Sequence, residues 1–439
     1  MKKIALLLII LAFAVSIMLS CGTTSDNFET PVNQEEISAP VSSEVPKVTE
    51  GPEATETEKQ TAADPAYTEF PKKDVPKKED YDYYFVFKAP EGNPRDIVMD
   101  YMLKMAQIQW TPTTTWTTGW KNTAKFKVEL TYEAGKTYYG LPYSDTRAPL
   151  SEFELFLDNG KFTPNSPYYE ELIGNHCSSS MTMAYQQIID LSYPAGLRPT
   201  TKRIGLLRFP DGIITPPSES TTTPNQWYSD QVLKVNDRDK IFEGYASLGK
   251  GDIVMKDTKN GGHTRMVSKV EVKKTVAGKI NPGSSVVYCV EQTNAWYDNQ
   301  KNSTWWIDKK YSFSQLYSDF FMPVTLDIFH EENPVIDDAV ICMKNKNTPD
   351  SILKMLNGTI ESNFPLSYVY ITIKDSNGKT VGEKFDYNMG EQYKYNLRNA
   401  GIKLGIDKLS PGTYKYEVVA AIARGSATVE SFEFTVPNK

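Results

Sequence analysis

The stretch Gly174-Asn175-His176-Cys177-Ser178-Ser179-Ser180 places a cysteine at the entrance to a predicted helix. Apolar residues follow at i, i+3, i+4, i+7 and i+8, which is the spacing of one buried helix face: Met181, Ala184, Tyr185, Ile188 and Ile189. We expect Asn175 to be the N-cap. Cys177 then lies in the first turn, where free backbone N–H groups and the helix dipole favour a thiolate. The alternative is a small buried hydrophobic residue, so the rest of the chain must supply partners.

The composition sets the class of protein. The chain has 439 residues, of which 40% are apolar and 12% aromatic. This is enough to bury the cores of two ordinary domains. The net charge is -7 and there is no large basic block. Nucleic acid is therefore excluded as the natural partner, because phosphate binding needs clustered Lys and Arg.

The first residues predict export. Lys2 and Lys3 precede an uncharged apolar run over residues 4–19, which indicates a signal peptide over residues 1–20. Met18-Leu19-Ser20-Cys21 resembles a bacterial lipobox, which implies lipidation of Cys21. We expect a protein held at the outer face of the cell membrane by this lipid alone, in or near the cell wall. A transmembrane anchor is the alternative, but the run is short for a full span.

Residues 21–79 are rich in Pro, Ser, Thr, Glu and Lys, and they predict a disordered tether. A flexible chain of this length spans about 40 Å on average. The remaining cysteines, Cys289 and Cys342, lie within apolar runs and are predicted to be strand core residues. A disulfide between them is left open.

A central domain is predicted over residues 80–330. Pro94 opens a helix, and Trp110, Trp116 and Trp120 follow in a Thr-rich segment, where packing is favoured over a saccharide- or peptide-binding role. Residues 125–132 alternate like a strand, and residues 194–226 are predicted to form a long surface excursion.

Three further strands follow in this domain. Gly251-Asp252-Ile253-Val254 marks a turn into one buried strand, and Gly261-Gly262-His263 a turn into the next. A third strand over residues 285–290 ends in Glu291-Gln292-Thr293-Asn294.

These residue types suit a cysteine nucleophile, a general base and an orienting residue. Cys177 stands at a helix start, His263 at a strand start and Glu291 at a neighbouring strand end. Thr293 and Asn294 are alternatives to Glu291 as the third residue. The other two histidines, His176 and His330, are interpreted as structural or surface residues.

Residues 94–328 resemble the papain-like superfamily of bacterial cell-wall peptidases and amidases, the NlpC-type and CHAP-type enzymes. The resemblance lies in Gly140-Leu-Pro-Tyr143-Ser144, in Cys177-Ser178 at a helix start, in Gly251-Asp252 before Gly262-His263, and in Glu291-Gln292. It implies that Cys177 is the nucleophile, His263 the base and Glu291 the orienter. It also implies that Tyr143 helps the backbone N–H of Cys177 to stabilise the oxyanion.

The sequence departs from the family pattern beside the nucleophile. NlpC-type enzymes usually have Asp-Cys-Ser-Gly, in which the aspartate reads the free amine of the stem peptide. Here His176 and Ser179 replace the aspartate and the glycine. His176, Ser178 and Thr293 are therefore candidate substrate-binding residues, and the choice of substrate stays open.

Residues 334–439 predict a β-sandwich of the immunoglobulin or fibronectin type. Alternating strands are expected over residues 335–343, 354–361, 368–374, 413–423 and 431–436, with a hairpin turn at Asp375-Ser-Asn377-Gly378. Leu409-Ser-Pro411-Gly412-Thr-Tyr414 looks like the tyrosine-corner entry of those folds. We expect an adhesive, spacer or substrate-binding module.

The predicted architecture is thus an α+β papain-like domain followed by an all-β sandwich. The expected function is a monomeric, lipid-anchored hydrolase that cleaves an amide bond of peptidoglycan stem peptides without metal or cofactor. One alternative is a non-catalytic wall-binding or adhesion lipoprotein on the same scaffold. The other is a transglutaminase-like acyl transferase, which would show the same order of Cys, His and acidic residue.

Overall fold

The computed structural model describes residues 73–121, 129–191, 210, 213–215, 228–259, 261–389 and 392–438. The predicted signal peptide, Cys21, most of the tether and nearly all of the excursion at 194–226 lie outside these residues. Within the described part of the chain, no helix has both the length and the apolar character needed to cross a bilayer.

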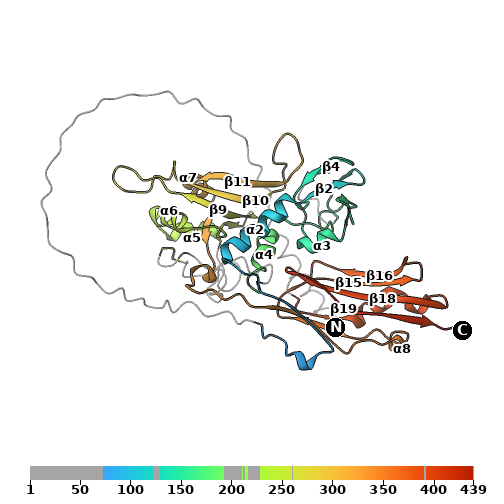
Figure 1. The fold of residues 1–439 in the computed structure, drawn as a ribbon. Coiled ribbons are helices and arrows are strands. Elements are labelled where there is room, and N and C mark those ends of the chain that lie inside the picture. Colours follow the sequence, from blue (N-terminus) through green and yellow to red (C-terminus); the bar gives the residue numbers. More distant parts are fainter. Residues whose placement is uncertain are drawn as a thin grey trace, which may run out of the picture.

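The fold is mixed α/β and largely β, with several antiparallel sheets and few helices (Figure 1). Its central sheet has the strand order β11-β10-β9-β8-β12. The strands are β8 (Ile253–Thr258), β9 (Gly261–Glu271), β10 (Val286–Gln292), β11 (Trp305–Ser312) and β12 (Met322–Val324), and all neighbours are antiparallel. The three strands predicted here from turns and apolar runs correspond to β8, β9 and β10.

Two packed helices support the N-terminal half of the candidate site, and the second of them bears its cysteine. In α2 (Pro94–Gln107), Pro94 opens the helix and the Asn93 side chain accepts a hydrogen bond from the Arg95 N–H. Its buried residues include Val98, Met102 and Met105. The second helix, α4 (Cys177–Tyr185), packs against α2 and against β9 and β10. The cysteine helix therefore rests on the strands that carry His263 and Glu291.

The turn before β8 is tied to α2 by a buried carboxylate. Asp252 accepts hydrogen bonds from the Gly249 N–H at 2.7 Å and from Thr325 Oγ1 at 2.6 Å, and it pairs with Arg95 at 3.1 Å. Tyr185, at the end of α4, donates to the Gly251 carbonyl at 2.7 Å. The Gly-Asp element thus has a structural task, because it fixes the start of the sheet to both helices.

Short strands form an aromatic-rich subdomain beside α2. They are β2 (Gln109–Pro112), β3 (Trp116–Thr117), β4 (Thr131–Tyr132), β5 (Tyr138–Tyr139), β6 (Leu157–Asp158) and β7 (Lys161–Phe162). Trp110 is buried and its indole Nε1 donates to the Gly140 carbonyl at 2.8 Å. Trp116 is buried as well and Trp120 contacts Tyr169, so these tryptophans pack as expected. Of the strand expected over 125–132, residues 125–128 lie outside the described part, and its last two residues form β4.

The remaining short elements complete the central region and the connection to the sandwich. The central region has α3 (Leu150–Glu154), α5 (Ser229–Val235), α6 (Arg238–Ser247), α7 (Phe313–Ser318) and η3 (Asp327–His330). Near the sandwich lie η1 (Lys78–Asp80), α8 (Pro349–Ile352), η4 (Leu397–Asn399), α9 (Gly401–Leu404) and η5 (Ile406–Lys408). η1 begins inside the stretch assigned to the tether.

The C-terminal region consists of two four-stranded antiparallel sheets. One has the order β1-β13-β14-β17 and the other β16-β15-β18-β19. Their strands are β1 (Tyr83–Phe87), β13 (Ala339–Lys344), β14 (Thr359–Ser362), β15 (Leu366–Asp375), β16 (Thr380–Asp386), β17 (Lys394–Asn396), β18 (Gly412–Ile422) and β19 (Gly425–Val436). The hydroxyl of Tyr414 donates to the Ser410 carbonyl at 2.9 Å, a contact of the tyrosine-corner kind.

The first strand of the described chain corrects the predicted domain boundary. β1 (Tyr83–Phe87) pairs with β13 in the sandwich, from Tyr83 opposite Met343 to Phe87 opposite Ala339. The central domain was expected to begin at residue 80, but residues 83–87 belong to the C-terminal sheet. Pairing between strands about 250 residues apart leaves no signal in local periodicity, which explains the difference.

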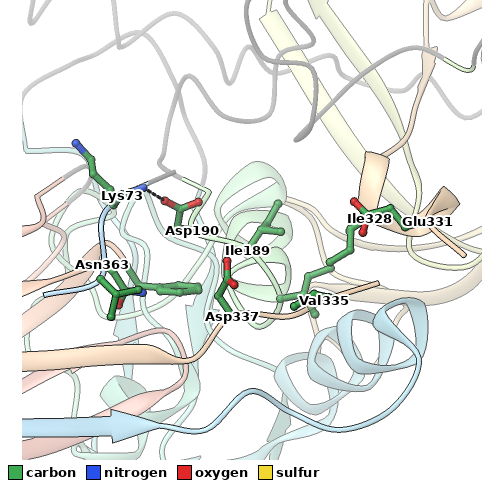
Figure 2. A pocket seen from close by; sticks show the side chains of 11 residues that line it. Lys73, Ile189, Asp190, Ile328, Glu331, Val335, Asp337 and Asn363 are labelled. Carbon is green, nitrogen blue, oxygen red and sulfur yellow. Dashed lines mark hydrogen bonds between the residues drawn. The ribbon is translucent and has the colours of Figure 1, made fainter. Parts of the chain in front are cut away.

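A cavity of about 140 Å³ lies between the sandwich and the central region (Figure 2). It is lined by Ile189 and Asp190, beyond the C-terminal end of α4, and by Val335 and Asn363 on the sandwich side. The backbone N–H of Lys73 lies 3.4 Å from Asp190 at its rim. This cavity is at the opposite end of α4 from Cys177, so it does not contribute to the candidate site.

Glu361→Gln tests the contact that holds the segment before β1 against the sandwich. The Glu361 carboxylate accepts from the Tyr81 hydroxyl at 2.6 Å and pairs with Lys394 at 2.9 Å and Lys344 at 3.1 Å. Burial alone would raise its pKa, but these partners lower it from 4.5 to about 2. The carboxylate therefore contributes stability that is present above pH 4.5 and is lost as the pH falls toward about 2.

We expect the melting temperature of Glu361→Gln to lie below that of the wild type at pH 7, with the difference shrinking in acid. Glu433→Gln, at an exposed position of β19, is the matched control. If the difference in melting temperature between the two proteins stays constant from pH 7 to pH 2, the stabilising role of the ionised Glu361 carboxylate is contradicted.

Candidate active site

The entrance to α4 is built by a different cap from the one predicted. His176, not Asn175, is the N-cap, with extended backbone at φ -127°. The Ser179 hydroxyl accepts a hydrogen bond from the His176 N–H at 2.9 Å. The Asn175 side chain instead donates to the Ala148 carbonyl at 2.7 Å and accepts from the Ser179 hydroxyl at 2.9 Å. The helix begins at Cys177, so Asn175 lies one residue before the N-cap, and its side-chain oxygen accepts from the Ser179 hydroxyl and not from a helical N–H.

Cys177 is the first residue of α4 and is 3% exposed. It belongs to the first helical turn, as the sequence predicts. Cys289 and Cys342 are thiols as well, so the disulfide left open between them is not formed. Burial raises the pKa of Cys289 far above its ordinary value and that of Cys342 to about 12. Neither of these two thiols ionises readily at neutral pH.

His263 and Glu291 meet directly. His263 Nε2 forms a hydrogen bond with Glu291 Oε2, between the neighbouring strands β9 and β10. The imidazole side chain is 22% exposed, whereas the glutamate side chain is 1% exposed. Because Nε2 is engaged by the carboxylate, Nδ1 is the ring nitrogen left for proton transfer. The structure thus brings His263 and Glu291 together, and their roles as base and orienter stay a prediction.

The Glu291 carboxylate has further partners that the sequence did not reveal. Arg265 Nε donates to Oε2 at 2.9 Å, the Tyr311 hydroxyl donates to Oε1, and Lys309 Nζ lies 3.7 Å from Oε1. Burial would raise the pKa of Glu291, but Arg265, His263 and Lys309 outweigh burial and hold it well below its usual range. The carboxylate is therefore ionised at neutral pH.

The cysteine half and the histidine half are joined through neighbouring elements. The Gln292 side chain donates from Nε2 to the Leu141 carbonyl at 2.8 Å, and Trp305 Nε1 donates to the same carbonyl at 2.9 Å. The adjacent Pro142 carbonyl accepts from the Asn175 N–H at 3.0 Å. A short chain of hydrogen bonds therefore runs from the residue after Glu291 to the residue two before Cys177.

The predicted oxyanion residue lies beside this chain. Tyr143 bridges to Asn175 through the backbone, and its ring stacks on Tyr169 with a centroid distance of 5.4 Å. The side chain is buried next to the helix entrance. The structure thus brings Tyr143 to the segment that leads into Cys177.

The other histidines and candidate residues lie at the start of α4, in η3 and just after β10. His176 is 2% exposed, its Nδ1 lies 3.2 Å from the Ser178 hydroxyl, and its Nε2 lies 3.6 Å from Asp145. His330 Nε2 lies 2.8 Å from Thr325 Oγ1. Thr293 accepts from Trp306 Nε1 at 3.2 Å and donates to the Ala295 carbonyl. Of the three residues considered as orienter, Glu291 holds His263 Nε2, whereas the Thr293 hydroxyl is engaged in its own loop.

Arg265, Lys309 and Tyr311 are the site residues that sequence reasoning missed. Arg265 follows His263 by two residues, so both side chains stand on one face of β9. That spacing was a usable signal once the histidine was singled out. The contributions of Lys309 and Tyr311 depend on the register of β10 with β11, which contains an irregularity between Cys289 and Glu291, so they could not be read from the sequence.

Comparison with known proteins does not assign the chain to a family. No protein-family model matches the chain, and no curated protein matches it. Among solved structures, it is similar to dimeric latent PorU from Porphyromonas gingivalis, with 15% identity over 43% of this chain and 16% of that chain. The TM-score of this pair is 0.15, so the likeness carries no argument about fold or function. Any function must be argued from the residues of the site.

Glu291→Gln should destabilise the protein strongly. The change removes the negative charge and leaves the Arg265 guanidinium buried without its counter-ion. Breaking a buried ion pair in this way costs about 3–5 kcal/mol. Urea unfolding at pH 7 measures the loss, with Glu243→Gln at an exposed position of α6 as the control. A loss below about 1 kcal/mol would show that Glu291 is not held as a buried anion.

Proposed function

We propose that the protein is an exported cysteine-dependent hydrolase that cleaves an amide bond of peptidoglycan. The observation that carries the proposal is the hydrogen bond between His263 Nε2 and Glu291, formed on the two strands against which the Cys177 helix packs. A buried carboxylate on one ring nitrogen leaves the other as a base. The first turn of a helix is a setting that favours a thiolate.

In the proposed reaction, His263 Nδ1 takes the thiol proton of Cys177 and the sulfur attacks the amide carbonyl carbon. The negative charge on the carbonyl oxygen is stabilised by the Cys177 backbone N–H and by Tyr143. The C–N bond then breaks as the imidazolium returns the proton to the leaving amine. Water, deprotonated by the same nitrogen, attacks the thioester carbonyl, and the cysteine leaves as the acid product is released.

The substrate class follows from the predicted location. A lipid-anchored protein with a long tether would face the cell wall, where the amide-bonded stem peptides of peptidoglycan are the abundant polymer linkage. The resemblance of Gly140-Leu-Pro-Tyr143, Cys177-Ser178 and Gly262-His263 to cell-wall peptidases supports the same substrate. The fold and the His–Glu pair alone are compatible with other amides, so peptidoglycan must be tested directly.

A second candidate is a non-catalytic wall-binding or adhesion lipoprotein. The observation that favours it is the burial of Cys177 and of the neighbouring His176, which is 2% exposed and lies 3.6 Å from Asp145. A thiol covered in this way could be a packing residue. The third candidate, an acyl transferase, shares the first half of the reaction and differs in passing the acyl group to an amine.

Thiol labelling separates the enzyme from the binding protein. We expect iodoacetamide at pH 7 to alkylate Cys177 at least 10-fold faster than Cys289 or Cys342, because burial raises the pKa of both of the latter. Peptide mass spectrometry locates the adduct. His263→Gln should slow the labelling of Cys177, and the unfolded chain gives the reference rate. Labelling of Cys177 no faster than in the unfolded chain would support the binding protein instead.

Digestion of purified peptidoglycan tests the reaction itself. The wild type should release fragments with new amino termini, Cys177→Ala should release none, and His263→Gln should lower the rate by on the order of 10²–10⁴-fold. Cys342→Ser, which changes a thiol in β13 of the C-terminal sheet, away from the proposed site, is the control for general damage. Equal release by the wild type and Cys177→Ala would end the hydrolase proposal, and amine incorporation without release would indicate the transferase.

A further inference from the structure

We propose that Arg265 is a positioning residue of this site, which sets the tautomer of His263 by keeping Glu291 anionic. The inference rests on the proposed function for its catalytic consequence, but its chemical core concerns only the three side chains. Arg265 and His263 both contact Glu291 Oε2, one through Nε at 2.9 Å and the other through Nε2.

The Arg265 side chain contacts two aromatic rings as well as Glu291. Its guanidinium carbon lies 3.7 Å from the centre of the Tyr311 ring and 4.1 Å from that of Phe321. The Tyr311 hydroxyl donates to the other oxygen of the same carboxylate. Phe321 also contacts the His263 ring edge-on, with 6.3 Å between centroids. One aromatic pair therefore locates the arginine, the carboxylate and the histidine relative to one another.

The protonation state of Glu291 decides which ring nitrogen of His263 carries the proton. An anionic carboxylate can only accept, so His263 must present Nε2–H and leave Nδ1 with its lone pair. A protonated carboxyl would donate to Nε2, and the neutral ring would then carry its proton on Nδ1. In that second tautomer, Nδ1 could not accept the thiol proton, and the proposed reaction would stop at its first step.

A carboxyl side chain that is 1% exposed would take up a proton unless a cation faced it. Two cations are available. Arg265 is itself 9% exposed and is directly hydrogen-bonded, whereas Lys309 is 29% exposed and stands off at 3.7 Å, over the Trp306 ring. The buried, bonded guanidinium interacts more strongly because water screens it less. Arg265 is thus the group that determines the charge of Glu291.

The tautomer of His263 can be measured without any activity assay. The protein has three histidines, so ¹⁵N NMR of the imidazoles is tractable, and the His263 signals are assigned by their loss in His263→Gln. In the wild type above pH 8, we expect the Nε2–H form. The neutral variants Arg265→Met and Arg265→Gln should populate the Nδ1–H form, whereas Arg265→Lys should retain Nε2–H. Lys309→Met, which removes the outer cation, is the matched control and should keep the wild-type tautomer.

The glutamine variant, which can still donate to Glu291, serves if the methionine variant does not fold. In peptidoglycan digestion, the two neutral variants should lose at least 10-fold in kcat with little change in KM, and Arg265→Lys should lose less. A folded neutral variant that keeps Nε2–H would overturn the proposal, as would an Arg265→Lys protein with the Nδ1–H form. If the tautomer responds as expected but the wild type releases nothing from peptidoglycan, the hydrolase proposal fails and the role of Arg265 stands.

Discussion

The buried carboxylate of Glu291 is the constraint on which the centre of the molecule depends. An ion removed from water must be compensated by charge and hydrogen bonds, or it neutralises. Here the compensation comes from both neighbouring strands: His263 and Arg265 from β9, and Lys309 and Tyr311 from β11. The same contacts that satisfy the charge therefore fix β9, β10 and β11 in one register. The stability of the sheet and the orientation of His263 are set together.

The residue after Glu291 extends this constraint to the helices. Gln292 is fully buried and holds the Leu141 carbonyl, while Pro142 holds the backbone of Asn175 at the entrance to α4. A shift of β10 would thus move both Glu291, which holds the His263 ring, and the loop that leads into the helix bearing the thiol. The dipeptide Leu141-Pro142 is bonded to β10 through Gln292 and to the entrance of α4 through Asn175. It therefore keeps the spacing between these two segments constant.

Local patterns predicted the parts whose interactions are local. The helix behind Cys177, the strands after Gly251 and Gly261, and the hairpin at Asp375 all depend on periodicity and turn chemistry within a few residues. The place of β1 in the sandwich could not be predicted, because Tyr83 and Met343 are joined only by strand pairing. His263 and Glu291 could be named because each lies near the end of a predicted strand. Lys309 and Tyr311 could not be named, because they reach Glu291 only through the pairing of β10 with β11. The cap at His176 was missed because the helix begins one residue later than a cap at Asn175 implies, and the Asn175 side chain bonds to Ala148 and Ser179 instead.

The comparison of Cys177 with Cys289 shows why position, not residue type, defines the candidate nucleophile. Cys289 lies two residues before Glu291 and is fully buried in β10. Burial raises its pKa, and although Arg265 opposes this effect, the Glu291 charge adds to it. The anion that would make His263 a base thus favours the protonated form of the Cys289 thiol on its own strand. A thiol can serve this pair only from an element that approaches the sheet without sharing its buried charges, and among the cysteines in the described residues Cys177 on α4 is the one so placed.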